Sequence, residues 1–130
     1  KVKPGKTILV SDSTNFAGMP PGNYSGHIGS EVVLTPLGKL HIKGTPNVLA
    51  GSGLSLLHCV NTLVGKKITT LSQAWDMASI RPSDFLDLSV KAGLAPGAPA
   101  DIVFFEVKNE EFSVIKTVKS GVTVYERGAR

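Results

Sequence analysis

The sequence predicts an α+β fold, and three observations carry that prediction. Apolar runs typical of strands stand near both ends of the chain, two amphipathic helical patterns lie between them, and glycine and proline mark the joints. The chain has 130 residues, 42% of them hydrophobic and 18% charged, which is typical of a globular domain. Because strands and helices form separate runs, the fold is α+β or combines pieces of two domains.

The first predicted element is a buried strand at residues 6–12, where aliphatic and β-branched residues follow Pro4 and Gly5. The strand ends at Asp12, and a loop rich in glycine and proline follows it. An aspartate in such a place is most often a turn former, because its side chain bonds the backbone just beyond it. In a parallel barrel, residues at the C-terminal ends of strands face the active site. The residues alone leave both interpretations of Asp12 open.

A hairpin and a first helix are predicted next. Residues 31–35 and 39–43 have the pattern of two short strands joined around residues 36–38. Ser52 is placed to cap a helix that ends at Gly65. Apolar residues fall on one face of that helix: Leu56, Leu57, Val60, Leu63 and Val64.

A second helix begins with a capping box made by Thr70 and Gln73. Arg81 and Pro82 either end this helix or start a short further turn at residues 83–86. Both helices are amphipathic, so each needs another element to pack against.

The last zone is predicted to be β-structure, after a turn-rich link at residues 93–101. Residues 100–107 include a nearly continuous apolar run, which indicates a strand. Residues 112–118 and 122–125 form a predicted hairpin across a Lys-Ser-Gly turn.

Composition excludes several classes of function. The net charge of +4 comes from basic residues that are scattered singly or in pairs, so a nucleic-acid site is not predicted. No segment is long and apolar enough to span a bilayer. The only cysteine, Cys59, is expected to be a small buried hydrophobe, and a reducing, cytoplasmic location is expected. The chain starts at Lys1 without a methionine, and we therefore expect a longer parent protein.

The histidines do not predict a metal site. His27, His41 and His58 are spread along the chain without the short spacing that ligand pairs show. We expect them to be surface or hydrogen-bonded histidines, and no metal-ligating residue is assigned in this chain.

Four segments in sequence order carry a resemblance to a known family: LVSDSTNFAGMPPGNY, VLAGSGLSLLHCVNTLV, AWDMASIRPSDFLDL and GLAPGAPADIVFFE. Together they resemble the C-terminal portion of the N-acetylglucosamine-6-phosphate deacetylases, a branch of the metal-dependent amidohydrolase superfamily. The last segment alone indicates only the superfamily. The segment containing LAGS narrows the resemblance to the deacetylases, and the likeness runs from about Thr7 to Tyr125.

The resemblance implies a fragment of a larger fold. Residues 7–12 are similar to the last strand of a (β/α)8 barrel, and the helices are similar to those outside that barrel. From Ala100 onward the chain is similar to the strands of a small β-sandwich domain. The implied division is residues 1–92 for the last barrel strand, hairpin insertion and outer helices, and residues 93–130 for the sandwich strands.

The resemblance also assigns roles to residues. Asp12 matches the catalytic aspartate that takes a proton from the attacking water and returns it to the departing sugar amine. Leu49, Ala50 and Gly51 match the segment whose backbone contacts substrate. The family binds a divalent metal, zinc or similar, through a glutamate and two histidines of earlier barrel strands, so we expect none bound to this chain.

The resulting prediction is a C-terminal fragment of an enzyme that deacetylates N-acetylglucosamine 6-phosphate in amino-sugar catabolism, inactive alone. The expected partner is a phosphorylated amino sugar, with no nucleic acid and no membrane. A barrel strand without its neighbours needs substitute partners, so a homo-oligomer is expected. The alternatives are a fragment of another amidohydrolase, such as a deaminase, cyclic amidase or other N-acyl hydrolase, and a non-catalytic β-rich interaction module.

Overall fold

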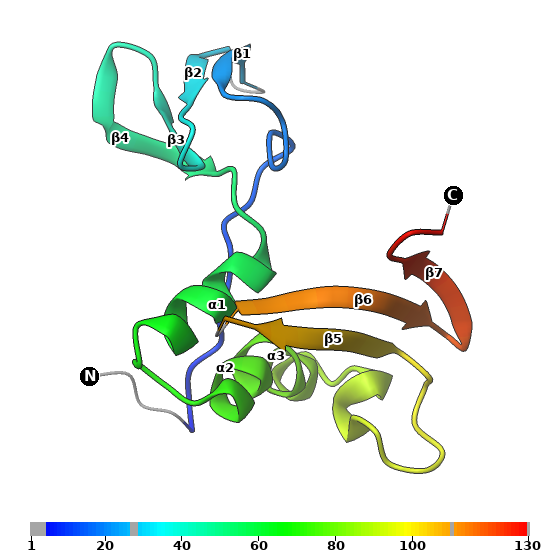
Figure 1. Ribbon diagram of the computed structural model, residues 1–130. Coiled ribbons are helices and arrows are strands. Elements are labelled where there is room, and N and C mark those ends of the chain that lie inside the picture. Colours follow the sequence, from blue (N-terminus) through cyan, green and yellow to red (C-terminus); the bar gives the residue numbers. More distant parts are fainter. Residues whose placement is uncertain (1–4, 27–28, 110, 130) are drawn as a thin grey trace. The chain divides into compact units, whose positions relative to one another are not determined.

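The chain forms two compact units, each with its own sheet (Figure 1). The hairpin unit is Val10–Cys59, and the helical unit combines Lys1–Leu9 with Val60–Arg130. The structure is a computed structural model that describes residues 5–26, 29–109 and 111–129. The predicted division at residues 92 and 93 refers to the barrel and sandwich of a longer protein, and it stays a prediction.

The hairpin unit contains a four-stranded antiparallel sheet in the order β1-β2-β3-β4. Its strands are β1 (Gly22–Ser25), β2 (Glu31–Leu34), β3 (Lys39–Ile42) and β4 (Thr45–Ser52). The predicted hairpin is confirmed as β2 and β3, with Val33 opposite His41. Sequence analysis missed β1 and β4. In β4 the residues from Thr45 to Leu49 are all exposed, so the strand lacks the alternation that would reveal it.

A small core holds the loop after Asp12 onto this sheet. Phe16, Val32, Leu34 and Leu40 are buried together, and Tyr24 and Ala50 pack against them. The rings of Phe16 and Tyr24 stack with centroids 5.1 Å apart. Because Phe16 comes from the loop and the other three from β2 and β3, burial of this apolar surface fixes the loop to the sheet.

The helical unit contains most of the helical residues of the chain. The helices are α1 (Leu56–Gly65), which continues from the hairpin unit, α2 (Leu71–Ala78), α3 (Ile80–Phe85) and the short 3-10 helix η1 (Ser89–Ala92). The capping box is confirmed, because the Thr70 hydroxyl accepts from the Gln73 N–H. Of the two alternatives at Arg81 and Pro82, the structure has the further turn, as α3, which begins at Ile80 rather than at the predicted residue 83. In the described part of the chain, no helix has the length and hydropathy needed to cross a membrane.

The predicted cap at Ser52 is wrong. Ser52 is the last residue of β4, and α1 begins four residues later at Leu56. Ser55 takes the capping position instead, because its hydroxyl accepts from the His58 N–H.

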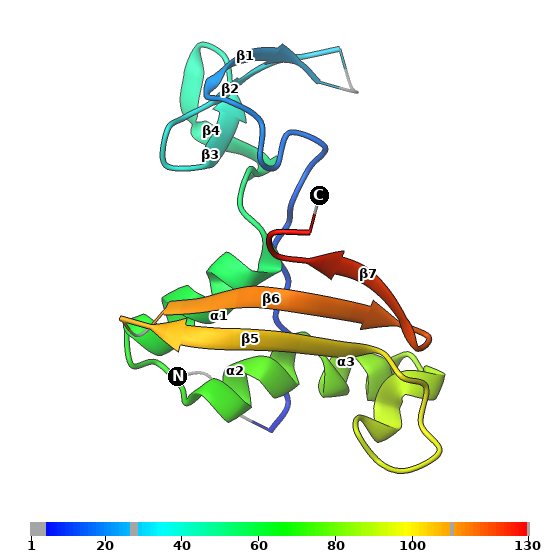
Figure 2. The ribbon, with the colours of Figure 1, turned by 45° about the vertical axis from the view of Figure 1, so that its right-hand side comes forward.

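The second sheet is antiparallel in the order β5-β6-β7, and it confirms the three C-terminal strands predicted (Figure 2). Its strands are β5 (Ile102–Lys108), β6 (Glu111–Lys119) and β7 (Val122–Glu126). The Trp75 ring of α2 lies 4.8 Å from the Phe105 ring of β5, and Phe105 meets Phe112 edge-on at 5.7 Å. Aromatic contacts therefore fix α2 to one face of this sheet.

The predicted buried strand at residues 6–12 is wrong. In the described part of that range the chain is extended but assigned to no strand, and Val10 is 72% exposed. The Leu9 N–H donates to the carbonyl of Met77 in α2, and a single parallel bridge joins Ser13 to Ser52. A buried parallel strand needs neighbouring strands on both sides, and the described residues supply none beside this segment.

Candidate functional site

Asp12 is held by main-chain hydrogen bonds at the end of the extended segment. Its carbonyl accepts from the Ser52 N–H at 2.8 Å, and the Thr14 N–H donates to the Ser52 carbonyl at 3.0 Å. These bonds form the parallel bridge at Ser13 and fix the backbone on both sides of Ser13, directly after Asp12. Asp12 itself is exposed and has φ of 53°, a left-handed conformation that aspartate adopts more readily than most residues.

Gly51 lies directly beside this aspartate. A β-carbon on Gly51 would stand 2.6 Å from the Thr14 methyl carbon, 3.0 Å from the Asp12 carbonyl oxygen and 3.8 Å from the Asp12 carboxylate oxygen Oδ2. Gly51 also has φ of 96°, which glycine adopts without steric cost. The structure thus brings together two predicted site residues that are 39 positions apart in the sequence.

The other two predicted substrate-binding residues, Leu49 and Ala50, differ in how far they are exposed. Leu49 pairs with His41 across the sheet, and its side chain is 64% exposed. Ala50 packs against the hydrophobic core of the hairpin unit. All three residues from Leu49 to Gly51 lie at the end of β4 that reaches Asp12, and their contact with substrate stays a prediction.

Two further serines hold the same junction. Sequence analysis gave Ser13 no role and predicted Ser52 only as a helix cap. The Ser13 hydroxyl donates to the Leu54 carbonyl, and the Ser52 hydroxyl accepts from the Leu54 N–H at 3.0 Å. No local pattern could have revealed the role of Ser13, because its partner lies 41 residues away in sequence, whereas the bond at Ser52 is local.

The described residues do not fit a metal ion. They contain no group of three histidine, cysteine, aspartate or glutamate side chains that could hold one. The His41 ring nitrogen Nδ1 lies 2.9 Å from the Ile42 carbonyl oxygen, and His58 is exposed. His27 lies outside the described residues. Cys59 is half-buried rather than fully buried.

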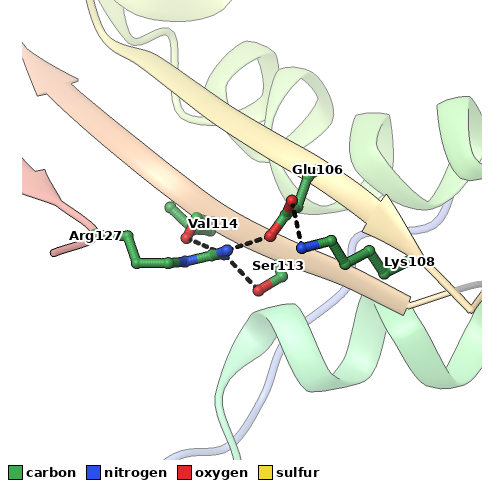
Figure 3. Close-up of polar contacts among 5 residues, drawn as sticks. All are labelled: Glu106, Lys108, Ser113, Val114 and Arg127. Atoms are coloured by element: carbon green, nitrogen blue, oxygen red, sulfur yellow. Dashed lines mark hydrogen bonds and ion pairs between the residues drawn. The ribbon is translucent and has the colours of Figure 1, made fainter.

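A second polar cluster lies in the helical unit (Figure 3). Arg127, just after β7, forms an ion pair with Glu106 of β5 and donates to Ser113 and to the Val114 carbonyl of β6. The Arg127 guanidinium, with Lys108 second, holds the pKa of Glu106 below its usual value, and Glu106 raises the pKa of Arg127. Both shifts favour the charged forms, which strengthens the ion pair. Because its contacts join β5, β6 and the end of β7, we interpret this cluster as structural.

Comparison with known proteins places the chain in a family. The sequence profile of the amidohydrolase family matches residues 31–124. The chain belongs to the amidohydrolase family. This amidohydrolase chain is 27% identical over 128 residues to N-acetylglucosamine-6-phosphate deacetylase of Danio rerio, covering 98% of the chain and 30% of that protein. It is 32% identical over 102 residues to N-acetylgalactosamine-6-phosphate deacetylase of Escherichia coli O157:H7, covering 75% of the chain and 25% of that protein.

A solved deacetylase structure is also similar to this amidohydrolase chain. A variant of N-acetyl-D-glucosamine-6-phosphate deacetylase from Mycobacterium smegmatis, solved in complex with N-acetyl-D-glucosamine-6-phosphate, superposes with a TM-score of 0.79 at 25% identity. The match covers 95% of the chain and 32% of that protein. The resemblance to the deacetylases is therefore confirmed, and the chain spans about a third or less of these three relatives.

Proposed function

We propose that this chain is the C-terminal part of a metal-dependent hydrolase that converts N-acetylglucosamine 6-phosphate and water to glucosamine 6-phosphate and acetate. Asp12 is the proposed catalytic residue. The observation that carries the proposal is its setting: an exposed carboxylate on a residue whose carbonyl accepts from Ser52 of β4, directly before the bridge at Ser13. The deacetylase relatives from Danio rerio and Mycobacterium smegmatis support this choice of substrate.

The chemistry of a carboxylate suits both steps of amide hydrolysis. In the first step Asp12 accepts a proton from water while the water oxygen forms a bond to the acetamide carbonyl carbon. In the second step the bond from that carbon to the sugar nitrogen breaks, and Asp12 returns the proton to the leaving amine. A positioned acid-base group contributes ~10² to 10⁴ in rate. Within the described residues, no hydrogen bond or ion pair occupies the Asp12 carboxylate, so it is available for this transfer.

The backbone from Leu49 to Gly51 is the proposed contact for the substrate. β4 is an edge strand of its sheet, paired with β3 on one side. Its other side reaches Asp12 through the bridge at Ser52. Peptide groups there lie next to the proposed proton acceptor, and they are suited to orient an amide substrate by hydrogen bonds.

The described residues contain no donor set for the metal of the superfamily. The proposal therefore includes a second part: the remaining ligands and the sugar-phosphate contacts belong to other segments of a longer enzyme, and this chain alone is inactive. With a single cysteine the protein fits a reducing compartment, and we propose the cytoplasm.

The test is a chimera in which this chain replaces the matched segment of the Danio rerio deacetylase. The chimera should release acetate from N-acetylglucosamine 6-phosphate, and Asp12→Asn should lower kcat by ~10² to 10⁴. Asp87→Asn is the matched control, because Asp87 is also exposed with φ of 52°, and it should leave kcat unchanged. Asparagine tolerates the left-handed conformation at both positions. Asp12→Asn is therefore confined to the acid-base group, whereas Asp87→Asn also removes the exposed ion pair with Lys91.

Two results would overturn the proposal. Turnover by the isolated chain at the rate of the chimera would remove the need for a longer enzyme. Equal kcat in the Asp12→Asn and Asp87→Asn chimeras would remove Asp12 from the chemistry and favour the non-catalytic interaction module.

A second substrate has one specific observation in its favour. The Escherichia coli relative, at 32% identity, is named for N-acetylgalactosamine 6-phosphate, which differs from the glucosamine compound in the configuration at one carbon. Comparing kcat/KM of the chimera for the two sugars decides between them, because one hydrogen-bonded hydroxyl is enough to give strong discrimination.

A further inference from the structure

We infer that Gly51 and Thr14 are positioning residues for Asp12. This inference rests on the proposed role of Asp12 as the proton acceptor. It goes further by giving Gly51 a function that does not depend on substrate. The glycine leaves space that the Thr14 methyl group occupies, and the two together determine where the Asp12 carboxylate lies.

The space around Gly51 is filled by the 12–14 segment. The nearest heavy atom to a β-carbon at that position would be the Thr14 methyl carbon at 2.6 Å, well inside van der Waals contact. The next would be the Asp12 carbonyl oxygen at 3.0 Å. A larger residue at position 51 therefore collides with the 12–14 segment, and either that segment or the end of β4 has to move.

Thr14 links the 12–14 segment to the rest of the hairpin unit. Its hydroxyl lies 3.4 Å from the Ser52 carbonyl, to which it donates, and accepts from the Phe16 N–H at 3.3 Å. Phe16 is buried in the core with 7% of its surface exposed. Thr14 thus connects the site to a fixed point, and a shift of Thr14 is transmitted to Asp12 through two peptide bonds.

Catalysis is sensitive to such a shift. A displacement of about 1 Å by a mutation outside the reacting groups can cost ~10² in rate. A glycine that only lets substrate approach its backbone would affect KM. A glycine that positions the proton acceptor would affect kcat, and this difference separates the two roles.

The structural test uses this chain and nuclear magnetic resonance. Gly51→Ala should shift the amide resonances of residues 12–14 and the carboxyl resonance of Asp12. Amide exchange of residues 12–14 should become several-fold faster, while the resonances and exchange rates of β2 and β3 stay unchanged. Gly44→Ala is the matched control: Gly44 also has positive φ, 82°, but no heavy atom lies within 4 Å of its would-be β-carbon. It should leave residues 12–14 unchanged.

Rescue provides the second arm. Thr14→Ser keeps the hydroxyl and removes the methyl carbon that a β-carbon at position 51 would meet first. When Thr14→Ser is combined with Gly51→Ala, the Asp12 resonances should move part of the way back to their wild-type positions. If Gly51→Ala does not fold, Thr14→Ser alone decides, because loss of the methyl group should loosen residues 12–14 and leave β2 and β3 intact. Unchanged Asp12 resonances in Gly51→Ala, or in Thr14→Ser when Gly51→Ala does not fold, would overturn the inference.

The activity arm separates this inference from the proposed function. In the chimera, Gly51→Ala should lower kcat by ~10² with little change in KM, and Thr14→Ser should restore part of it. A rise in KM at constant kcat would assign Gly51 to substrate contact and overturn the positioning role. A chimera whose kcat does not respond to Asp12→Asn would instead remove the proposed function, while the resonance shifts still test the geometry.

Discussion

The two units of this chain hold a carboxylate in opposite ways. In the hairpin unit, Asp12 is placed by main-chain bonds that its own carbonyl and the Thr14 N–H make to Ser52, and within the described residues its carboxylate has no hydrogen-bond or ion-pair partner. In the helical unit, Glu106 is placed by its own side chain, which contacts Arg127 and Lys108. A carboxylate held through its backbone keeps its oxygens available for proton transfer, whereas one held through its oxygens joins strands.

The two units also differ in how they are held together. The hairpin unit has one small core around Phe16 and Leu40, and that core includes the loop that follows Asp12. The helical unit buries apolar side chains of its own, Met77 among them, and is further joined by the aromatic contacts of Trp75, Phe105 and Phe112 and by hydrogen bonds between side chain and backbone. Loss of packing should therefore affect the candidate site more in the hairpin unit than in the helical unit.

The largest expected effect comes from the core of the hairpin unit. Leu40→Ala removes a side chain with 1% exposure and should lower the free energy of unfolding of that unit by about 2 to 5 kcal/mol. Amide exchange in β2 and β3 measures the loss, and amides of residues 12–14 should exchange faster as well. Leu37→Ala is the control, because Leu37 is 86% exposed and its truncation should change stability by less than about 0.5 kcal/mol. Equal effects of the two changes would contradict the packing described.

A smaller effect is expected in the helical unit at Asn61. Its amide nitrogen donates to the Phe112 carbonyl at 3.1 Å, and its amide oxygen accepts from the Phe112 N–H at 2.9 Å. Asn61→Ala leaves both peptide groups without this partner and should cost about 1 to 3 kcal/mol, measured by urea unfolding followed through the fluorescence of Trp75. Asn61→Asp keeps one of the two bonds and should fall between wild type and Asn61→Ala. An alanine variant as stable as wild type would show that water replaces these bonds.

Much of the fold could be predicted because its signals are local. The capping box at Thr70, the hairpin of β2 and β3, and the strands β5 to β7 each depend on residues close together in sequence. β4 was missed because Thr45 to Leu49 are exposed, so no apolar alternation marks it. The buried strand at residues 6–12 was wrong because burial depends on neighbouring strands, which local apolar character does not report.

The candidate site also depends on contacts between residues far apart in sequence, which local patterns do not report. Asp12 and the segment ending at Gly51 were found through the family resemblance, whereas their spatial contact came from the structure. The roles of Thr14 and Ser13 could not be predicted, because each depends on a partner about forty residues away. A threonine or serine has no distinctive sequence pattern when its partner is a distant backbone carbonyl.

The smallest effect should appear in the pH dependence of the helical unit. Hydrogen bonding to Arg127 and then to Lys108 lowers the pKa of Glu106 from 4.5 in its unperturbed state. A carboxyl with a lowered folded-state pKa stabilises the fold above its unfolded value, and that contribution disappears as the pH falls through the lower folded value. Glu106 is partly exposed and its partners are on the surface, so the contribution is small and screened by salt.

The difference in urea midpoint between wild type and Glu106→Gln should therefore be constant above about pH 5.5 and shrink below about pH 4.5. Carboxyl resonances give the direct check, because Glu106 should titrate below the unfolded value in wild type and closer to that value in Arg127→Gln. A Glu106 titration unchanged by Arg127→Gln would show that the guanidinium is not the main cause. It would also weaken the contrast between a carboxylate held through its oxygens and Asp12, which the main chain holds.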